Sequence, residues 1–129
     1  MNQKRLLRWF MIIGGVFEII IGFFLMILHP FLWTVGMTTI PIFNQMAGTF
    51  LLGFGILLVF SSTAIEPFRI IPLVNILLRI IMIIFSFIQL PQYPNFLIIL
   101  LPAMIYDLLW SILVLILLKN LGLLKLQIS

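Results

Sequence analysis

Four long apolar segments dominate this chain and restrict what it can fold into. They cover residues 9–28, 42–60, 72–90 and 96–118, and stretches with proline, asparagine, glutamine or charged residues separate them. A membrane-spanning helix needs about 20 mostly apolar residues to cross roughly 30 Å of hydrocarbon. Each segment meets this requirement, so the sequence predicts four crossings of a lipid bilayer.

Only α-helices suit such segments in lipid. Backbone amides in the hydrocarbon must bond within their own segment, and the alternating pattern of a membrane β-barrel is missing from the sequence. Hydrophobic residues make up 64% of the 129 residues and charged residues 8%, whereas about a quarter of a soluble domain is charged. We therefore expect an all-α polytopic membrane protein in which residues 1–129 form a single four-helix transmembrane bundle.

Lysine and arginine mark one side of the predicted membrane, because cytoplasmic flanks of membrane helices accumulate them. The basic residues that flank the spans are Lys4, Arg5, Arg8, Arg69, Lys119 and Lys125. The connections 29–41 and 91–95 contain neither lysine nor arginine. This bias predicts a multi-pass protein of the cell membrane with both termini and the middle connection in the cytoplasm.

The basic residues permit two other interpretations, which the sequence disfavours. They form no continuous stripe, so the net charge of +4 does not indicate nucleic acid binding. The opening MNQKRLLRWF resembles the start of a secretory signal, but the apolar run after it is long, contains Glu18 and lacks an A-x-A-like site. We therefore expect an uncleaved first anchor.

The two connections without basic residues predict different structures. Residues 29–41 are too apolar for a solvated loop and too interrupted by proline and glycine for a fifth span. We expect a short interfacial helix there, with Pro30 in its first turn, His29 as its cap and Trp33 at the headgroup level. The connection 91–95 is a short proline-bounded turn, which predicts that the third and fourth spans are antiparallel neighbours.

Three charged residues, Glu18, Arg79 and Asp107, fall inside the predicted spans. Glu18 lies roughly 15 Å beyond Arg8 along a helix axis, and Asp107 lies roughly 18 Å before Lys119, so both carboxyls are placed near the midplane. Each charge costs about 2.5–3.5 kcal/mol at a helix centre. We therefore expect the three to face inward, with Arg79 between the two carboxyls and with a proton that the carboxyls could share.

Small and polar residues surround these charges and define the candidate site. Gly14, Glu18 and Gly22 recur every four residues, so a neighbouring backbone can approach the acid closely. The second span has no charge but carries a face of small and polar residues, and we expect this face to converge on the charges. The residues expected to bind a ligand or handle protons are Glu18, Arg79, Asp107, Gln45, Asn75, Trp110 and Tyr106, and those expected to pack helices are Gly14, Gly22, Gly48 and Gly55.

The sequence offers little basis for enzymatic chemistry. It contains no cysteine, which removes thiolate nucleophiles, thiolate metal sites and disulfides. It has no nucleophile elbow, phosphate-binding loop, zinc-protease helix or dinucleotide fingerprint. His29 has no second histidine or carboxylate nearby for a metal shell. We expect a protein without catalytic residues, metal or bound cofactor, a quinone being the one cofactor that a polar pocket would suit.

Several motifs together resemble the DoxX-like superfamily of small four-helix membrane proteins. They are G-x-x-E-x-x-x-G in the first span, the following H-P, F-N-Q-M-A-G-T-F-L-L-G-F-G, a basic residue in the third span, and Y-D-L-L-W in the fourth. The resemblance implies a four-helix bundle with cytoplasmic ends, and some members are associated with quinone-linked oxidoreductases. It points to Glu18, Gln45, Gly48, Arg79 and Asp107 as the polar core, with Arg79 where many relatives have lysine.

Three functional hypotheses follow from the charged centre. The first is a non-enzymatic membrane protein that binds a small amphipathic ligand, a quinone or a lipid, or serves as a subunit of a larger complex. The second is a proton-coupled transporter or channel that works as a homo-oligomer. The third is a structural scaffold in which the charges only fix the register of the helices.

Overall fold

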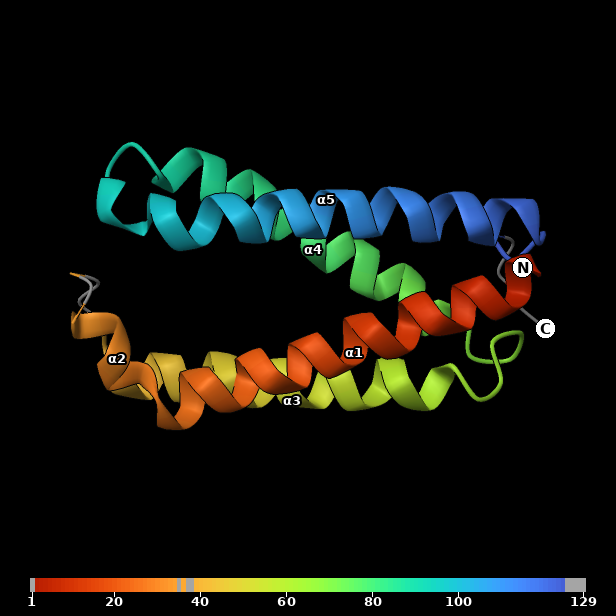
Figure 1. The fold of residues 1–129 in the computed structure, drawn as a ribbon, viewed down its shortest axis with the longest axis horizontal. Coiled ribbons are helices and arrows are strands. Elements are labelled where there is room, and N and C mark those ends of the chain that lie inside the picture. Colours follow the sequence, from red (N-terminus) through yellow and green to blue (C-terminus); the bar gives the residue numbers. More distant parts are fainter. Residues whose placement is uncertain (1, 35, 37–38, 125–129) are drawn as a thin grey trace.

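The computed structural model describes residues 2–34, 36 and 39–124, and most of these residues are helical, with no strand among them. The elements are α1 (Gln3–Ile27), α2 (His29–Thr34), α3 (Pro41–Ser61), α4 (Ile70–Gln89), η1 (Pro94–Phe96) and α5 (Leu97–Asn120) (Figure 1). α1, α3, α4 and the segment Pro94–Asn120 are long and apolar enough to cross a membrane. The prediction of an all-α chain with four long apolar helices is confirmed.

Most helix ends lie within about two residues of the ends of the apolar segments, but α1 begins well before residue 9. α1 begins at Gln3, where the Asn2 side chain accepts a hydrogen bond of 3.0 Å from the backbone N–H of Lys4. The helix includes the polar residues that precede the apolar run, because backbone hydrogen bonds can form there too. The prediction from apolar residues alone begins only where the apolar run begins. Pro41 is the first residue of α3, a position at which the missing N–H would have no partner in any case.

The two connections contain short helices. α2 has Pro30 as its second residue, which confirms the predicted short helix with Pro30 in its first turn. His29 is the first residue of α2, its ring lies edge-on to Trp33 at 5.7 Å, and its Nδ1 has no hydrogen-bond partner in the described structure, so the predicted capping role is not seen. The other connection leads from α4 through η1 into α5. α4 and α5 are antiparallel neighbours, as predicted.

The long helices form two antiparallel pairs. α1 lies beside α3 along its length. α4 begins near α1 and α3 and crosses toward α5, beside which it ends near η1 (Figure 1). We call the end where α1 begins and α5 ends the N-terminal end of the bundle. The basic residues Lys4, Arg5, Arg8, Arg69 and Lys119 belong to this end, while Lys125 lies outside the described residues.

Glycines allow α1 and α3 to approach each other closely. A Cβ atom added to Gly55 would lie 2.6 Å from the carbonyl oxygen of Gly15, and one added to Gly48 would lie 2.5 Å from that of Gly22. The two glycines of each helix are about two turns apart and therefore share a face. Gly14, by contrast, makes room for the Trp110 indole, 2.7 Å from an added Cβ.

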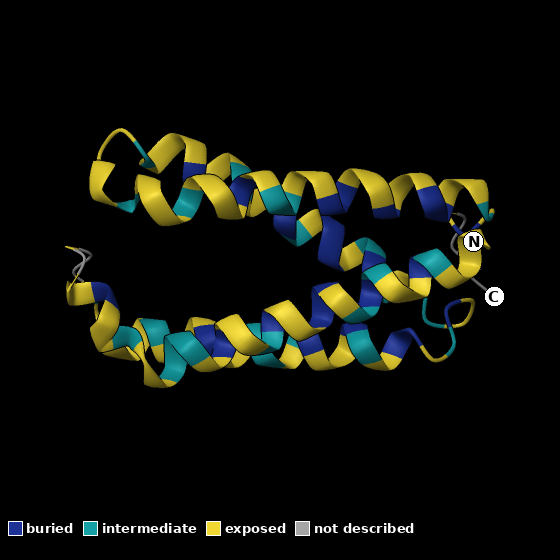
Figure 2. Cartoon of the chain, viewed as in Figure 1, coloured by how far each residue is buried: buried dark blue, intermediate teal, exposed yellow. Residues whose placement is uncertain are grey.

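The apolar core lies toward the N-terminal end. Its buried members are Leu7, Met11, Leu58, Ile65, Ile76, Trp110, Val114, Leu117, Leu118 and Leu123. Figure 2 shows buried positions in the centre and toward the N-terminal end, whereas the end with α2 is mostly exposed. The bundle is therefore packed at one end and more open at the other.

Substitution of Gly55 tests the close contact of α1 and α3. Gly55→Ala is expected to lower the free energy of unfolding by about 1–3 kcal/mol, because the added Cβ would force two backbones apart. Gly53 is the matched control, since a Cβ added there meets no atom within 4 Å. Gly53→Ala should leave stability unchanged or raise it slightly. SDS titration in mixed micelles measures both variants, and equal losses would contradict the close approach.

Candidate functional site

Arg79 of α4 lies at the centre of the bundle, buried, and joins three helices. Its Nη2 donates a hydrogen bond to Glu18 of α1 at 2.8 Å, and its Nη1 donates to Asp107 of α5 at 2.5 Å. Its Nε donates to the Asn75 side-chain oxygen at 2.6 Å. The planar fork of the guanidinium can serve several acceptors in fixed directions. One cation therefore holds carboxylates from two other helices.

Asn75 connects Glu18 and Arg79 a second time. It lies one turn before Arg79 on the same face of α4. Its Nδ2 donates to both carboxylate oxygens of Glu18, at 2.9 and 3.2 Å, while its Oδ1 accepts from Arg79. The amide presents a donor to the acid and an acceptor to the base, so it fixes both side chains without adding charge.

Aromatic rings cover two sides of the Arg79 guanidinium. Its carbon atom lies 4.2 Å from the centre of the Trp110 ring and 5.5 Å from that of Tyr106. The Trp110 Nε1 donates to the Phe10 carbonyl at 2.9 Å, and Gly14 leaves space for the indole. These contacts place cation–π partners on a desolvated charge, where such interactions are strongest. Trp110 therefore anchors Arg79 toward the N-terminal end.

A cavity of about 520 Å³ borders this charged group, and α1, α3, α4 and α5 all line it. It extends from the charged residues toward the end with α2. Its polar lining consists of Glu18, Asn75, Arg79, Ser86, Tyr106 and Asp107. The remaining lining is apolar: Phe17, Ile21, Leu51, Phe54, Leu78, Met82, Ile83, Leu100, Pro102, Ala103 and Met104. A few converging polar groups in an apolar cavity of this size are typical of small-molecule sites.

The three charged side chains that line the cavity differ in how far they are exposed. The Asp107 side chain is 26% exposed, compared with 10% for Glu18 and 6% for Arg79. Two carboxylates against one guanidinium leave one formal negative charge. Asp107 is the least buried of the three charged side chains that line the cavity.

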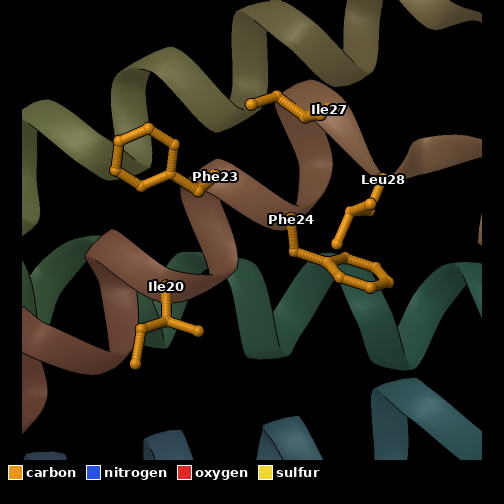
Figure 3. Close-up of a pocket in the computed structure, with 5 residues that line it drawn as sticks. All are labelled: Ile20, Phe23, Phe24, Ile27 and Leu28. Carbon is orange, nitrogen blue, oxygen red and sulfur yellow. The ribbon is translucent and has the colours of Figure 1, made fainter.

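A second pocket, of about 410 Å³, lies on α1 and in the turn after it. Figure 3 shows its lining residues, Ile20, Phe23, Phe24, Ile27 and Leu28. All of these side chains are apolar, so the pocket offers no group for recognition or chemistry. We therefore restrict the candidate site to the cavity beside Arg79.

The structure brings most of the expected site residues together, but two lie elsewhere. Glu18, Asn75, Arg79, Tyr106 and Asp107 line the cavity, whereas Trp110 lies behind Arg79 and does not line it. Gln45 is exposed on α3 and is also absent from the lining, which corrects the expected convergence of the polar face of that helix. Gln45 lies about 9 Å along the axis from Leu51, toward the end with α2. The face of α3 turned to α1 carries glycine instead.

Some contributors were missed from the sequence. Gly15, which packs on Gly55, looks like its neighbour Gly14, and only the rotation of α1 separates their roles. The apolar residues that line the cavity, such as Leu78 and Met82, could not be recognised from the sequence. Apolar side chains occur equally on an outer apolar surface, in a core and in a cavity wall. Among the described residues, no group of three or more His, Cys, Asp or Glu side chains could hold a metal ion.

Comparison with protein-family models, with curated proteins and with solved structures finds no match to this chain.

Removal of Arg79 should destabilise the bundle far more than removal of another arginine. Arg79→Leu leaves two carboxylates without their cation and is expected to cost about 3–5 kcal/mol of unfolding free energy. Arg69→Leu is the control, because Arg69 precedes α4 and takes no part in the site, and it should cost less than about 1 kcal/mol. SDS titration measures both, and small, equal losses would contradict the buried ion pairs.

Proposed function

We propose that this chain is an integral protein of the cell membrane that binds a small amphipathic ligand, a quinone or a lipid, in the cavity beside Arg79. It catalyses no reaction itself in this proposal. The observation that carries the proposal is the cavity itself, whose apolar walls end at Glu18, Arg79 and Asp107. Such a site suits a molecule with an apolar chain and a polar head.

The outer surface supports placement in a membrane. Large apolar side chains point outward along all the long helices, including Phe50 at 63%, Phe87 at 70% and Ile98 at 75% exposure. Soluble monomers rarely expose such extensive apolar surface, whereas hydrocarbon covers it without cost. The basic residues at the N-terminal end favour an orientation with both termini in the cytoplasm. In that orientation the cavity lies toward the outer half of the bilayer.

The resemblance to the DoxX-like superfamily supports a quinone as one candidate ligand, and the apolar walls support a lipid as the other. The same resemblance favours a role as a subunit of a larger membrane complex. The extensive apolar surface leaves room for protein as well as lipid neighbours.

A proton-coupled transporter or channel is less well supported by the packing. Transport needs a polar path that continues from the site to both ends of the bundle. Between the site and the N-terminal end, however, Leu7, Met11, Leu58 and Val114 are fully buried, each with 0% exposure. This tightly packed half favours binding at the cavity over passage through the protein.

Filling the cavity should remove the ligand. Ala103→Trp places a large ring at a position that lines the cavity, whereas Ala47→Trp places the same ring at an exposed position of α3 away from it. Solvent extraction of the purified proteins followed by mass spectrometry quantifies retained lipids and quinones. We expect an amphiphile retained by the parent chain and by Ala47→Trp, and a loss of about tenfold or more in Ala103→Trp. Equal retention in all three proteins would contradict the proposed function.

Removal of all three charges together separates a binding role from a structural one. The combination Glu18→Gln, Arg79→Met and Asp107→Asn leaves no unpaired charge, so it should be more stable than Arg79→Leu alone. It should nevertheless lose the ligand in the same extraction, because the polar end of the cavity is gone. Full retention of the ligand would instead favour the scaffold hypothesis, in which the charges only set helix packing.

A further inference from the structure

The cavity presents an acceptor to its occupant, and this acceptor belongs to Asp107. In the described structure, Asp107 accepts a hydrogen bond from Arg79 through Oδ1, and no donor reaches its Oδ2. Glu18 differs, since Asn75 donates to both of its oxygens and Arg79 donates to one. Asp107 also has the most exposed side chain of the three charged residues. Its free oxygen is therefore available to a headgroup.

Arg79 is poorly placed to receive a headgroup of its own. The guanidinium donates to three side chains from α1, α4 and α5, and its carbon atom lies 4.2 Å from the Trp110 ring centre. Only 6% of its side chain is exposed. Its positive charge is already paired with the carboxylates of Glu18 and Asp107, so it leaves no free cation for a carboxylate or phosphate headgroup in a low-dielectric cavity.

Tyr106 lines the cavity on the same helix as Asp107, but its hydroxyl is buried and has no hydrogen-bond partner among the described residues. The free oxygen of Asp107 therefore carries the inference, and the Tyr106 hydroxyl is not part of it.

We propose that Asp107 determines the specificity of the cavity, which takes a single-chain amphiphile whose headgroup donates a hydrogen bond and carries no negative charge. Hydroxyl and ammonium headgroups meet this requirement, and carboxylates do not. Among quinones, the requirement selects the hydroquinone form, because the oxidised ring carries only acceptors. This inference rests on the proposed function and adds the chemical class of the ligand.

Dodecyl amphiphiles that share one chain and differ in the headgroup test the inference. Dodecylamine, dodecanol, dodecyl methyl ether and dodecanoate are titrated into the purified full chain in a neutral detergent near pH 7, and native mass spectrometry counts the bound molecules. The amine and the alcohol should bind about tenfold more tightly than the ether and the carboxylate. Only the first two can donate a charge-assisted hydrogen bond to Asp107. Equal binding of all probes, or tightest binding of dodecanoate, overturns the inference but leaves the proposed function standing. Failure of every probe to bind overturns the proposed function itself.

Two isosteric variants test the role of Asp107. Asp107→Asn should weaken dodecylamine binding about tenfold and strengthen dodecanoate binding, because the free carboxylate oxygen is gone. Glu18→Gln removes the same formal charge from a less exposed residue and should change the preference much less. Equal changes in the two variants would show that net charge alone sets the preference and would overturn the assignment to Asp107. Size-exclusion chromatography and thermal unfolding check that both variants fold. If a variant does not fold, the probe series on the unsubstituted protein still tests the inference.

Discussion

The pairing of the Arg79 guanidinium with two carboxylates is the interaction on which the rest of this structure depends. Away from water, a charge is tolerated only when it is paired and hydrogen-bonded. Arg79 meets this condition for itself, for Glu18 and for Asp107, and Asn75 completes the hydrogen bonds of Glu18. Because the three charges come from α1, α4 and α5, their pairing also sets how these helices are rotated and how deep each lies in the bundle.

The bundle is asymmetric about this group, and the asymmetry creates the site. Toward the N-terminal end, the Trp110 indole packs on Arg79 and the apolar side chains beyond it are fully buried. Toward the other end, the pairs α1–α3 and α4–α5 are less tightly packed, and the cavity lies between them. The charged group is thus closed on one side and accessible on the other. An occupant can reach Asp107 while its chain remains against apolar walls.

The two carboxylates differ in their hydrogen bonds. Glu18 accepts bonds from Asn75 and Arg79 and belongs to the framework that orients the guanidinium. Asp107 accepts one bond from Arg79 and keeps part of its side chain exposed to the cavity. Two acids of similar chemistry therefore have different surroundings, and in the proposed function Glu18 positions Arg79 while Asp107 recognises the ligand. The close glycine contact of α1 with α3 supports this arrangement, since it holds Glu18 at a constant depth.

The number of long helices, their apolar character and the need for Glu18, Arg79 and Asp107 to avoid lipid could be predicted from the sequence, because these properties depend on local composition and on the cost of isolated charge. Which residues face the cavity could not. The roles of Gly14 and Gly15, the exposure of Gln45 and the position of Trp110 behind Arg79 depend on helix rotation and crossing. Those are set by contacts between segments distant in sequence, and an apolar side chain looks the same whether it faces lipid, core or cavity.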